Sequence, residues 1–176
     1  MAGVTPPAVR IVQLSPEALA ALANGDVERA SVLSGLALSP WQVSEESIST
    51  WRRRATQVVD TPADLGWVTG VIVDEATGAA VGKAGFHSAP DQEGLVELGY
   101  AVDPEYRRRG YARAALLVMV DRARADRAVR VLRATVSPDN EASLGLIRSL
   151  PFVENGEQWD EEDGLETIYE LPVQRE

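Results

Sequence analysis

The stretch LVELGYAVDPEYRRRGYA, residues 95–112, decides the fold of this chain. Residues 95–102 have the length and composition of a β-strand, and Gly110 is followed by apolar side chains at helical spacing, which predicts a helix to about residue 126. The first turn of a helix presents unpaired N–H groups and the positive end of the helix dipole, and a glycine there lets a ligand approach the backbone. With three arginines before the glycine, this strand, turn and helix predict a site for a phosphate or pyrophosphate group.

The rest of the chain adds strands and helices on both sides of this stretch. Strands are predicted at residues 9–14, 67–74, 79–87, 129–136, 152–159 and 166–171, and helices at residues 15–24, 26–32, 47–58 and 138–150. Ser15 and Asp26 have the residue types that cap helix N-termini, and Trp41 and Trp51 are expected to anchor the region between residues 35 and 65 to the core. This order of elements describes a mixed α/β sheet with helices on both faces.

Length and composition indicate one ordinary globular domain over residues 1–176. The apolar runs are shorter than the about 18 residues that a membrane span needs, and residues 1–10 lack the pattern of a signal peptide. We therefore expect a cytoplasmic protein with no membrane partner. The chain has no cysteine and a single histidine, His87, which excludes disulfides and a cysteine nucleophile and makes a metal site or a Ser-His-Asp triad unexpected.

The charge is strongly uneven along the chain. The formal net charge is -10, which disfavours a nucleic-acid partner. Residues 107–133 carry nine arginines and two acidic residues, so this segment has a charge of +7 and the remainder -17. Two interpretations stay open at this point: a solvated, arginine-rich helix face, or a local site for an anionic ligand.

The motif Arg-x-x-Gly-x-Ala, after a strand that carries Gly99-Tyr100, resembles the acetyl-CoA motif of the GNAT N-acetyltransferases. Residues 96–107 look most like the branch that includes the ribosomal-protein N-terminal acetyltransferases. A second block, Ala134-Thr135-Val136 followed by Asn140-Glu141-Ala142-Ser143, lies at the distance found in this family. The resemblance covers residues 66–172 well, as the cofactor-binding core, and the N-terminal strand and helices of residues 1–65 only loosely.

The resemblance implies an α+β fold of the GNAT type. Its twisted, mostly antiparallel sheet would have six to seven strands, with helices on both faces and a splay between the fourth and fifth strands. The pantetheine arm of acetyl-CoA would lie in that splay, with no metal ion. The residues expected to hold acetyl-CoA are Ala101, Val102, Arg107, Arg108, Arg109, Gly110, Tyr111, Ala112, Asn140 and Ser143. The Val102 N–H would polarise the thioester carbonyl.

Glu97 is the expected general base. On an alternating strand, Glu97 shares one face with Gly99 and Ala101, where small side chains leave room for a ligand. An amine attacks a thioester only when neutral, so a carboxylate at this place could remove its proton. The other interpretation is an ordinary exposed strand glutamate.

The sequence departs from the family at the proton donor to the departing thiolate. Many members of the family have a tyrosine seven residues after the asparagine of the second block, and Ile147 stands there in this chain. Ser143 is the candidate relay, although it could equally cap or decorate its helix.

The sequence therefore predicts an N-acetyltransferase that transfers the acetyl group directly to an amine in a ternary complex. The acceptor could be a small amine, an antibiotic or a protein N-terminus. His87 is either near the acceptor pocket or exposed at a strand end, and the acidic turn of residues 160–163 would favour a cationic acceptor if it flanks that pocket. The alternatives are an acetyl-CoA-binding regulatory module without turnover, or an enzyme for another acyl-CoA or a hydroxyl acceptor. A homodimer is compatible with the sequence, but no motif shows it.

Overall fold

The computed structural model describes residues 5–173. The strands are β1 (Val9–Val12), β2 (Gly70–Asp74), β3 (Ala80–Phe86), β4 (Leu95–Val102), β5 (Val131–Val136), β6 (Val153–Asp160) and β7 (Gly164–Pro172), and the helices are α1 (Pro16–Ala23), α2 (Val27–Ser34), α3 (Glu45–Asp60), α4 (Tyr111–Ala125) and α5 (Glu141–Arg148). They belong to two compact units, one with the described residues up to Ala89 and Gly99–Val118, the other with Pro90–Leu98 and the described residues from Met119 on. β4 and α4 each contribute to both units, and the single domain expected from the sequence stays a prediction.

The strands form a seven-stranded sheet in the order β1-β2-β3-β4-β5-β7-β6. The pairs β1–β2, β2–β3, β5–β7 and β6–β7 are antiparallel, and β4 runs parallel to β5. The registered pairing of β4 with β5 joins Leu95, Val96 and Glu97 to residues 131–133. The expected mixed α+β fold with a mostly antiparallel sheet is thereby confirmed.

Capping side chains fix the starts of α1 and α2, as the sequence predicts. Ser15 Oγ accepts a hydrogen bond from the Ala18 N–H at the start of α1, and the Asp26 carboxylate accepts one from the Arg29 N–H at the start of α2. α2 continues two residues beyond the predicted end, to Ser34, because Gly35 supplies the left-handed C-cap with a φ of 69°.

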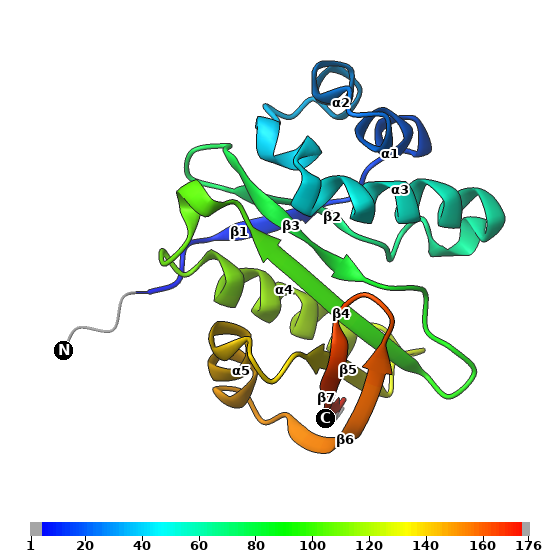
Figure 1. The fold of residues 1–176 in the computed structure, drawn as a ribbon, viewed down its shortest axis with the longest axis vertical. Coiled ribbons are helices and arrows are strands. Elements are labelled where there is room, and N and C mark those ends of the chain that lie inside the picture. Colours follow the sequence, from blue (N-terminus) through cyan, green and yellow to red (C-terminus); the bar gives the residue numbers. More distant parts are fainter. Residues whose placement is uncertain (1–4, 174–176) are drawn as a thin grey trace. The chain divides into compact units, whose positions relative to one another are not determined.

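In the first unit the three N-terminal helices cover one face of β1–β3, and α4 begins on the other face (Figure 1). Trp51 of α3 is fully buried, packed with Val71 and Val73 of β2 in one apolar cluster. Ile72, between these two valines, is also fully buried and points to the opposite face of the strand. Burial on both faces explains why β2 is a continuous apolar run rather than an alternating one.

The strand predicted from residue 67 starts at Gly70. The amides of Trp67 and Val68 both donate to the Asp64 carbonyl, at 2.8 and 3.1 Å, so these residues complete a turn instead of extending the strand.

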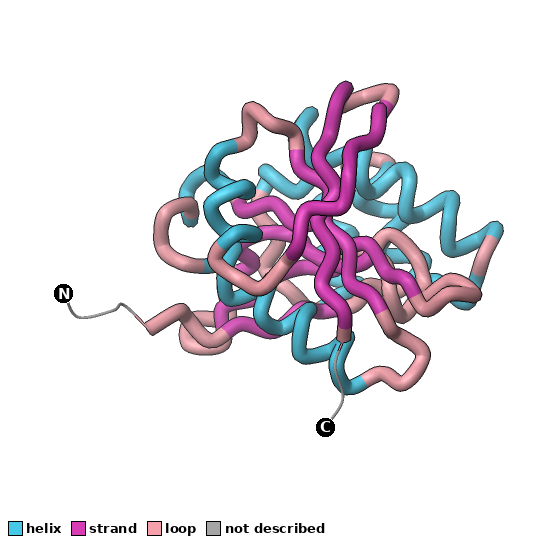
Figure 2. Tube along the Cα trace, turned by 90° about the horizontal axis from the view of Figure 1, so that it is seen from below, coloured by secondary structure: helices cyan, strands magenta, loops and turns pink. Residues whose placement is uncertain are grey.

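In the second unit, β5 alternates between buried and half-buried residues; Figure 2 shows the strands in magenta and the helices in cyan. Leu144 and Ile147 are the buried side chains of α5. β6 is largely exposed because it is an edge strand, paired only with β7. Within residues 5–173, no helix is long and apolar enough to cross a bilayer.

Candidate functional site

The loop before α4 has the backbone geometry of an anion site. Arg108 and Gly110 both have left-handed φ angles, of 63° and 86°. Left-handed residues that alternate with right-handed ones can turn successive N–H groups toward one side, which is the geometry of an anion-binding nest. A side chain at Gly110 would be strained by that φ, and its Cβ would stand 3.2 Å from Cδ of Pro7. The first turn of α4 contains no acidic residue to oppose an anion.

Tyr111, the first residue of α4, anchors the loop to the β2–β3 hairpin. Its hydroxyl donates a 2.7 Å hydrogen bond to Asp74, and both side chains are buried. The bond from Tyr111 and the Ala76 amide lower the pKa of Asp74, whereas the hydrogen bond to Asp74 raises the pKa of Tyr111. The position of α4, and therefore of the loop, depends on this buried contact.

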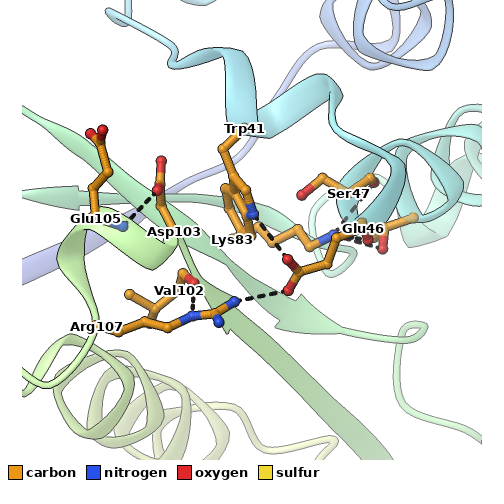
Figure 3. A network of polar contacts seen from close by, with 9 residues as sticks. Trp41, Glu46, Ser47, Lys83, Val102, Asp103, Glu105 and Arg107 are labelled. Atoms are coloured by element: carbon orange, nitrogen blue, oxygen red, sulfur yellow. Dashed lines mark hydrogen bonds and ion pairs between the residues drawn. The ribbon is translucent and has the colours of Figure 1, made fainter.

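Arg107 makes intramolecular contacts at the site where the sequence predicts a cofactor contact. Its Nε donates to the Val102 carbonyl at 2.9 Å, and its guanidinium pairs with Glu46 of α3 at 3.0 Å (Figure 3). Arg108 and Arg109 are exposed, and the Arg109 guanidinium lies 5.5 Å from the ring centre of Tyr106. In this loop Arg107 thus binds the backbone of the preceding strand, whereas Arg108 and Arg109 extend to the surface as exposed cations.

Other arginines of the positively charged segment have structural partners as well. Arg133 of β5 forms a half-buried pair with Glu170 of β7 at 2.6 Å, which lowers the pKa of Glu170. Arg124 lies 3.8 Å from Asp121 along α4. Three arginines of the segment, Arg107, Arg124 and Arg133, thus pair with acidic residues of the protein, and both interpretations of the segment stay open.

Glu97 is half-buried on β4 and is held by Thr135 of β5. The threonine hydroxyl donates to a Glu97 carboxylate oxygen at 2.8 Å. Arg133 is the register partner of Glu97, yet its guanidinium turns to Glu170 on the next strand. The hydrogen bond from Thr135 therefore restricts the orientation of the Glu97 carboxylate.

His87 lies against the glycine that follows Glu97 by two residues. Its Nε2 is 3.0 Å from the place where a Cβ on Gly99 would stand, so the imidazole occupies the space that the glycine leaves. The backbone of His87 is fixed by α3, since its carbonyl accepts hydrogen bonds from Gln57 at 2.7 Å and Arg54 at 3.3 Å. His87 is thus half-buried beside Gly99 in the first unit, and a place near the acceptor pocket stays a prediction.

The second sequence block forms the start of α5. Asn140 is the N-cap, and its side-chain oxygen accepts a hydrogen bond from the Ser143 N–H at 3.1 Å. Ser143 is half-buried in the first turn, and Ile147 is fully buried in the core. The Asn140 oxygen thus has a capping role in addition to the cofactor contact predicted for it. Ala101 is half-buried and Val102 buried at the end of β4.

Lys83 is a feature that sequence reasoning missed. It is the only lysine in the chain, and it is 6% exposed on β3. Its ammonium donates to Thr50 at 2.9 Å and lies 5.6 and 6.0 Å from the ring centres of Trp41 and Trp51. Burial lowers its pKa to about 8. The available signal was a single lysine, among sixteen arginines, within an apolar strand.

The chain is similar to known acetyltransferases in sequence. The family described as "Acetyltransferase (GNAT) domain" matches residues 9–153, which includes the N-terminal part that resembled the family only loosely. The L-2,4-diaminobutyric acid acetyltransferase of Streptomyces coelicolor is 30% identical over 74% of this chain and 75% of its own length. An uncharacterized N-acetyltransferase of Bacillus subtilis is also 30% identical, over 51% of this chain and 54% of its own.

Solved structures agree on the fold. A ribosomal-protein-S5-alanine acetyltransferase from Vibrio fischeri has a TM-score of 0.63 with 20% identity, and covers 94% of this chain and 92% of its own. A chimeric spermidine N-acetyltransferase from Vibrio cholerae has a TM-score of 0.65 with 16% identity, over 94% and 95% of the two chains.

Proposed function

The chain belongs to the GNAT family of acetyltransferases, and we propose that this N-acetyltransferase holds acetyl-CoA at residues 107–112. The observation that carries the proposal is the left-handed backbone at Arg108 and Gly110 directly before α4. A nest of amides at a helix N-terminus fits a pyrophosphate, and two exposed arginines beside it add charge-assisted contacts.

The rest of the co-substrate would extend from this loop along the end of β4. In the proposal, the backbone of Ala101 and Val102 binds the pantetheine arm, and the Val102 N–H polarises the thioester carbonyl. Asn140 and Ser143 would contact the arm from the start of α5. Acetyl-CoA supplies an activated acyl carbon, and the protein supplies position, charge and a proton acceptor.

Glu97 is the proposed general base. It removes a proton from the acceptor ammonium or amine, directly or through water, as the nitrogen forms a bond to the acetyl carbon. The carbon–sulfur bond then breaks, and the CoA thiolate leaves and takes up a proton. Thr135 orients the Glu97 carboxylate by its 2.8 Å hydrogen bond. The chain has no cysteine, so a cysteine-bound acetyl group is excluded, and direct transfer within a ternary complex is the proposed route.

We expect a cationic amine as acceptor. The relative from Streptomyces coelicolor acts, by its name, on diaminobutyric acid, which carries two amines. The β6–β7 turn of this chain has four consecutive acidic residues, 160–163. Carboxylates near an acceptor site would attract such amines and raise their encounter rate. Diamines, polyamines and basic peptide N-termini are therefore the first acceptors to test.

The test measures CoA release with acetyl-CoA and a panel of these amines, for the wild type and for Glu97→Gln. Removal of a general base should lower kcat/KM at neutral pH by about 10-fold or more. Glu93→Gln is the matched control, because it removes the same charge from the exposed loop that precedes the same strand. Unchanged kinetics of Glu97→Gln across the pH range would contradict the role of Glu97.

A second candidate function is an acetyl-CoA-binding module without turnover. Ile147, fully buried at the position of the family's tyrosine, favours it because the usual proton donor is absent there. Calorimetry that shows acetyl-CoA binding, together with no CoA release for any amine, would support this alternative. Absence of binding would contradict both functions.

A further inference from the structure

We propose that Glu46 of α3 is a positioning residue for acyl transfer, which acts by holding Arg107 against the backbone of Val102. The inference rests on the proposed function, because Val102 and the loop from Arg107 are the proposed binding elements for acetyl-CoA. Glu46 itself lies in the first turn of α3, sixty-one residues before Arg107 in the chain.

Both carboxylate oxygens of Glu46 are engaged (Figure 3). One accepts from the Arg107 guanidinium at 3.0 Å, and the other accepts from the indole N–H of Trp41 at 3.2 Å. A carboxylate held at both oxygens cannot rotate freely, so it presents a fixed acceptor to the arginine. Arg107 in turn uses a second nitrogen, Nε, to bind the Val102 carbonyl at 2.9 Å. The guanidinium is thereby held between a side chain and a backbone group.

The contact with Val102 closes the turn between β4 and α4. Val102 is the last residue of β4, and Arg107 follows the short 3-10 helix Pro104–Tyr106. Asp103 stabilises the same turn, because its carboxylate accepts from the Glu105 N–H at 3.0 Å and from the Ser39 hydroxyl at 2.9 Å. A shift of Arg107 would move the end of the strand and the left-handed residue after it together.

Lys83 braces the part of α3 that carries Glu46. Its ammonium lies beneath the first turn of the helix, 3.5 Å from the Glu46 carbonyl and 3.4 Å from the Ser47 carbonyl. The shorter bond to Thr50, at 2.9 Å, ties the next turn to the same group. The charged groups that act on this ammonium are Glu46 and Arg54, both from α3. The hydrogen bonds from Lys83 therefore hold the backbone around Glu46, while the Glu46 side chain pairs with Arg107.

The chain provides a matched control in Glu45. Glu45 and Glu46 are adjacent acidic residues in the first turn of α3, so each favours the helix dipole in the same way. Glu45 is exposed, and the contacts to Trp41 and Arg107 belong to Glu46. Glu45→Gln thus removes the same charge from the same helix end without the contact in question.

The experiment compares wild type, Glu46→Gln, Glu46→Asp and Glu45→Gln by acetyl-CoA affinity and by kcat/KM for acetyl-CoA. Glu46→Gln should weaken both by about fivefold at low salt, which is the upper range for a half-exposed ion pair. Glu45→Gln should change them less than about twofold, and Glu46→Asp should restore part of the loss. At 0.5 M salt the difference between the two glutamine variants should shrink, because salt screens exposed charges. Equal thermal unfolding midpoints for these two variants would show that the effect is not a loss of folding.

Equal effects of Glu46→Gln and Glu45→Gln, or no effect of either, would overturn the inference while leaving the proposed function intact. A wild type that binds acetyl-CoA but releases no CoA would overturn turnover alone, and the affinities of the variants then decide the role of Glu46. A wild type that does not bind acetyl-CoA would overturn both proposals.

Discussion

Replacing Lys83, the only lysine in the chain, by methionine should remove a rise in folding stability between pH 7 and pH 9. The ammonium is buried among α3 and two tryptophans, and burial lowers its pKa to about 8, from 10.5 in an exposed lysine. A cation whose pKa is lower in the folded than in the unfolded state weakens folding as long as both states are protonated. The penalty falls as the pH rises above 8, because the folded protein releases the proton first.

The magnitude follows from the difference between the two pKa values. Each pKa unit corresponds to about 1.4 kcal/mol, so the full penalty for Lys83 is about 3 kcal/mol below pH 8. Between pH 7 and pH 9 only part of the difference is released, which gives a rise in the free energy of unfolding of about 1 kcal/mol. In a chain of this size, that rise corresponds to an increase in Tm of about 3 °C.

Urea unfolding at pH 7, 8 and 9 measures the effect as the difference between wild type and Lys83→Met, so other titrating groups cancel. Lys83→Arg is a second variant that should also lose the pH dependence, because arginine stays charged throughout this range, but it should be less stable at every pH. Thr50→Val is the control, since it removes the 2.9 Å hydrogen-bond partner and leaves the lysine in place. It should keep the rise.

A single lysine also gives a single side-chain signal when the protein is labelled with ¹³C at lysine Cε. That signal should titrate with a midpoint near pH 8. A midpoint near 10.5, or parallel pH profiles for wild type and Lys83→Met, would refute the reasoning from burial.

Two further substitutions test contacts at the candidate site. Tyr111→Phe should destabilise the protein by about 1 to 2 kcal/mol in urea unfolding at pH 7, because it removes a buried hydrogen bond to the charged Asp74. The loss should decrease as the pH falls through the lowered pKa of Asp74, because the stability that this carboxylate contributes at neutral pH disappears when it is protonated in the folded protein. A loss that stays constant down to the most acidic pH at which the protein is still folded would contradict this. Gly99→Ala should displace the imidazole of His87, whose Nε2 lies 3.0 Å from the new Cβ, and shift the single histidine NMR signal. If the signal does not move in Gly99→Ala, then the packing of His87 on Gly99 is wrong.

Much of the fold could be read from local sequence because the interactions involved are local. Ser15 and Asp26 accept hydrogen bonds from the N–H groups of residues only three positions later, Ala18 and Arg29. The residue type at the cap is therefore enough to predict where each helix begins. The loop at Gly110 was predictable for the same reason, since the strand, the loop with its glycine and the helix start all lie within residues 95–112. The family match over residues 9–153 confirms the resemblance found in these motifs.

Only the tertiary structure decided how the side chains of this region are used. The sequence placed Arg107 among cofactor contacts, whereas the fold brings Glu46 to it from another helix. Lys83 likewise takes its role from α3, more than thirty residues away, and His87 packs against Gly99, twelve residues further along the chain on β4. Such contacts depend on how strands and helices pack against one another. The spacing of residue types along a single helix or strand cannot predict them. The sequence thus determined the family and the place of the turn proposed to bind the anion, and the packing of α3 on the strands determined which side chains hold that turn in place.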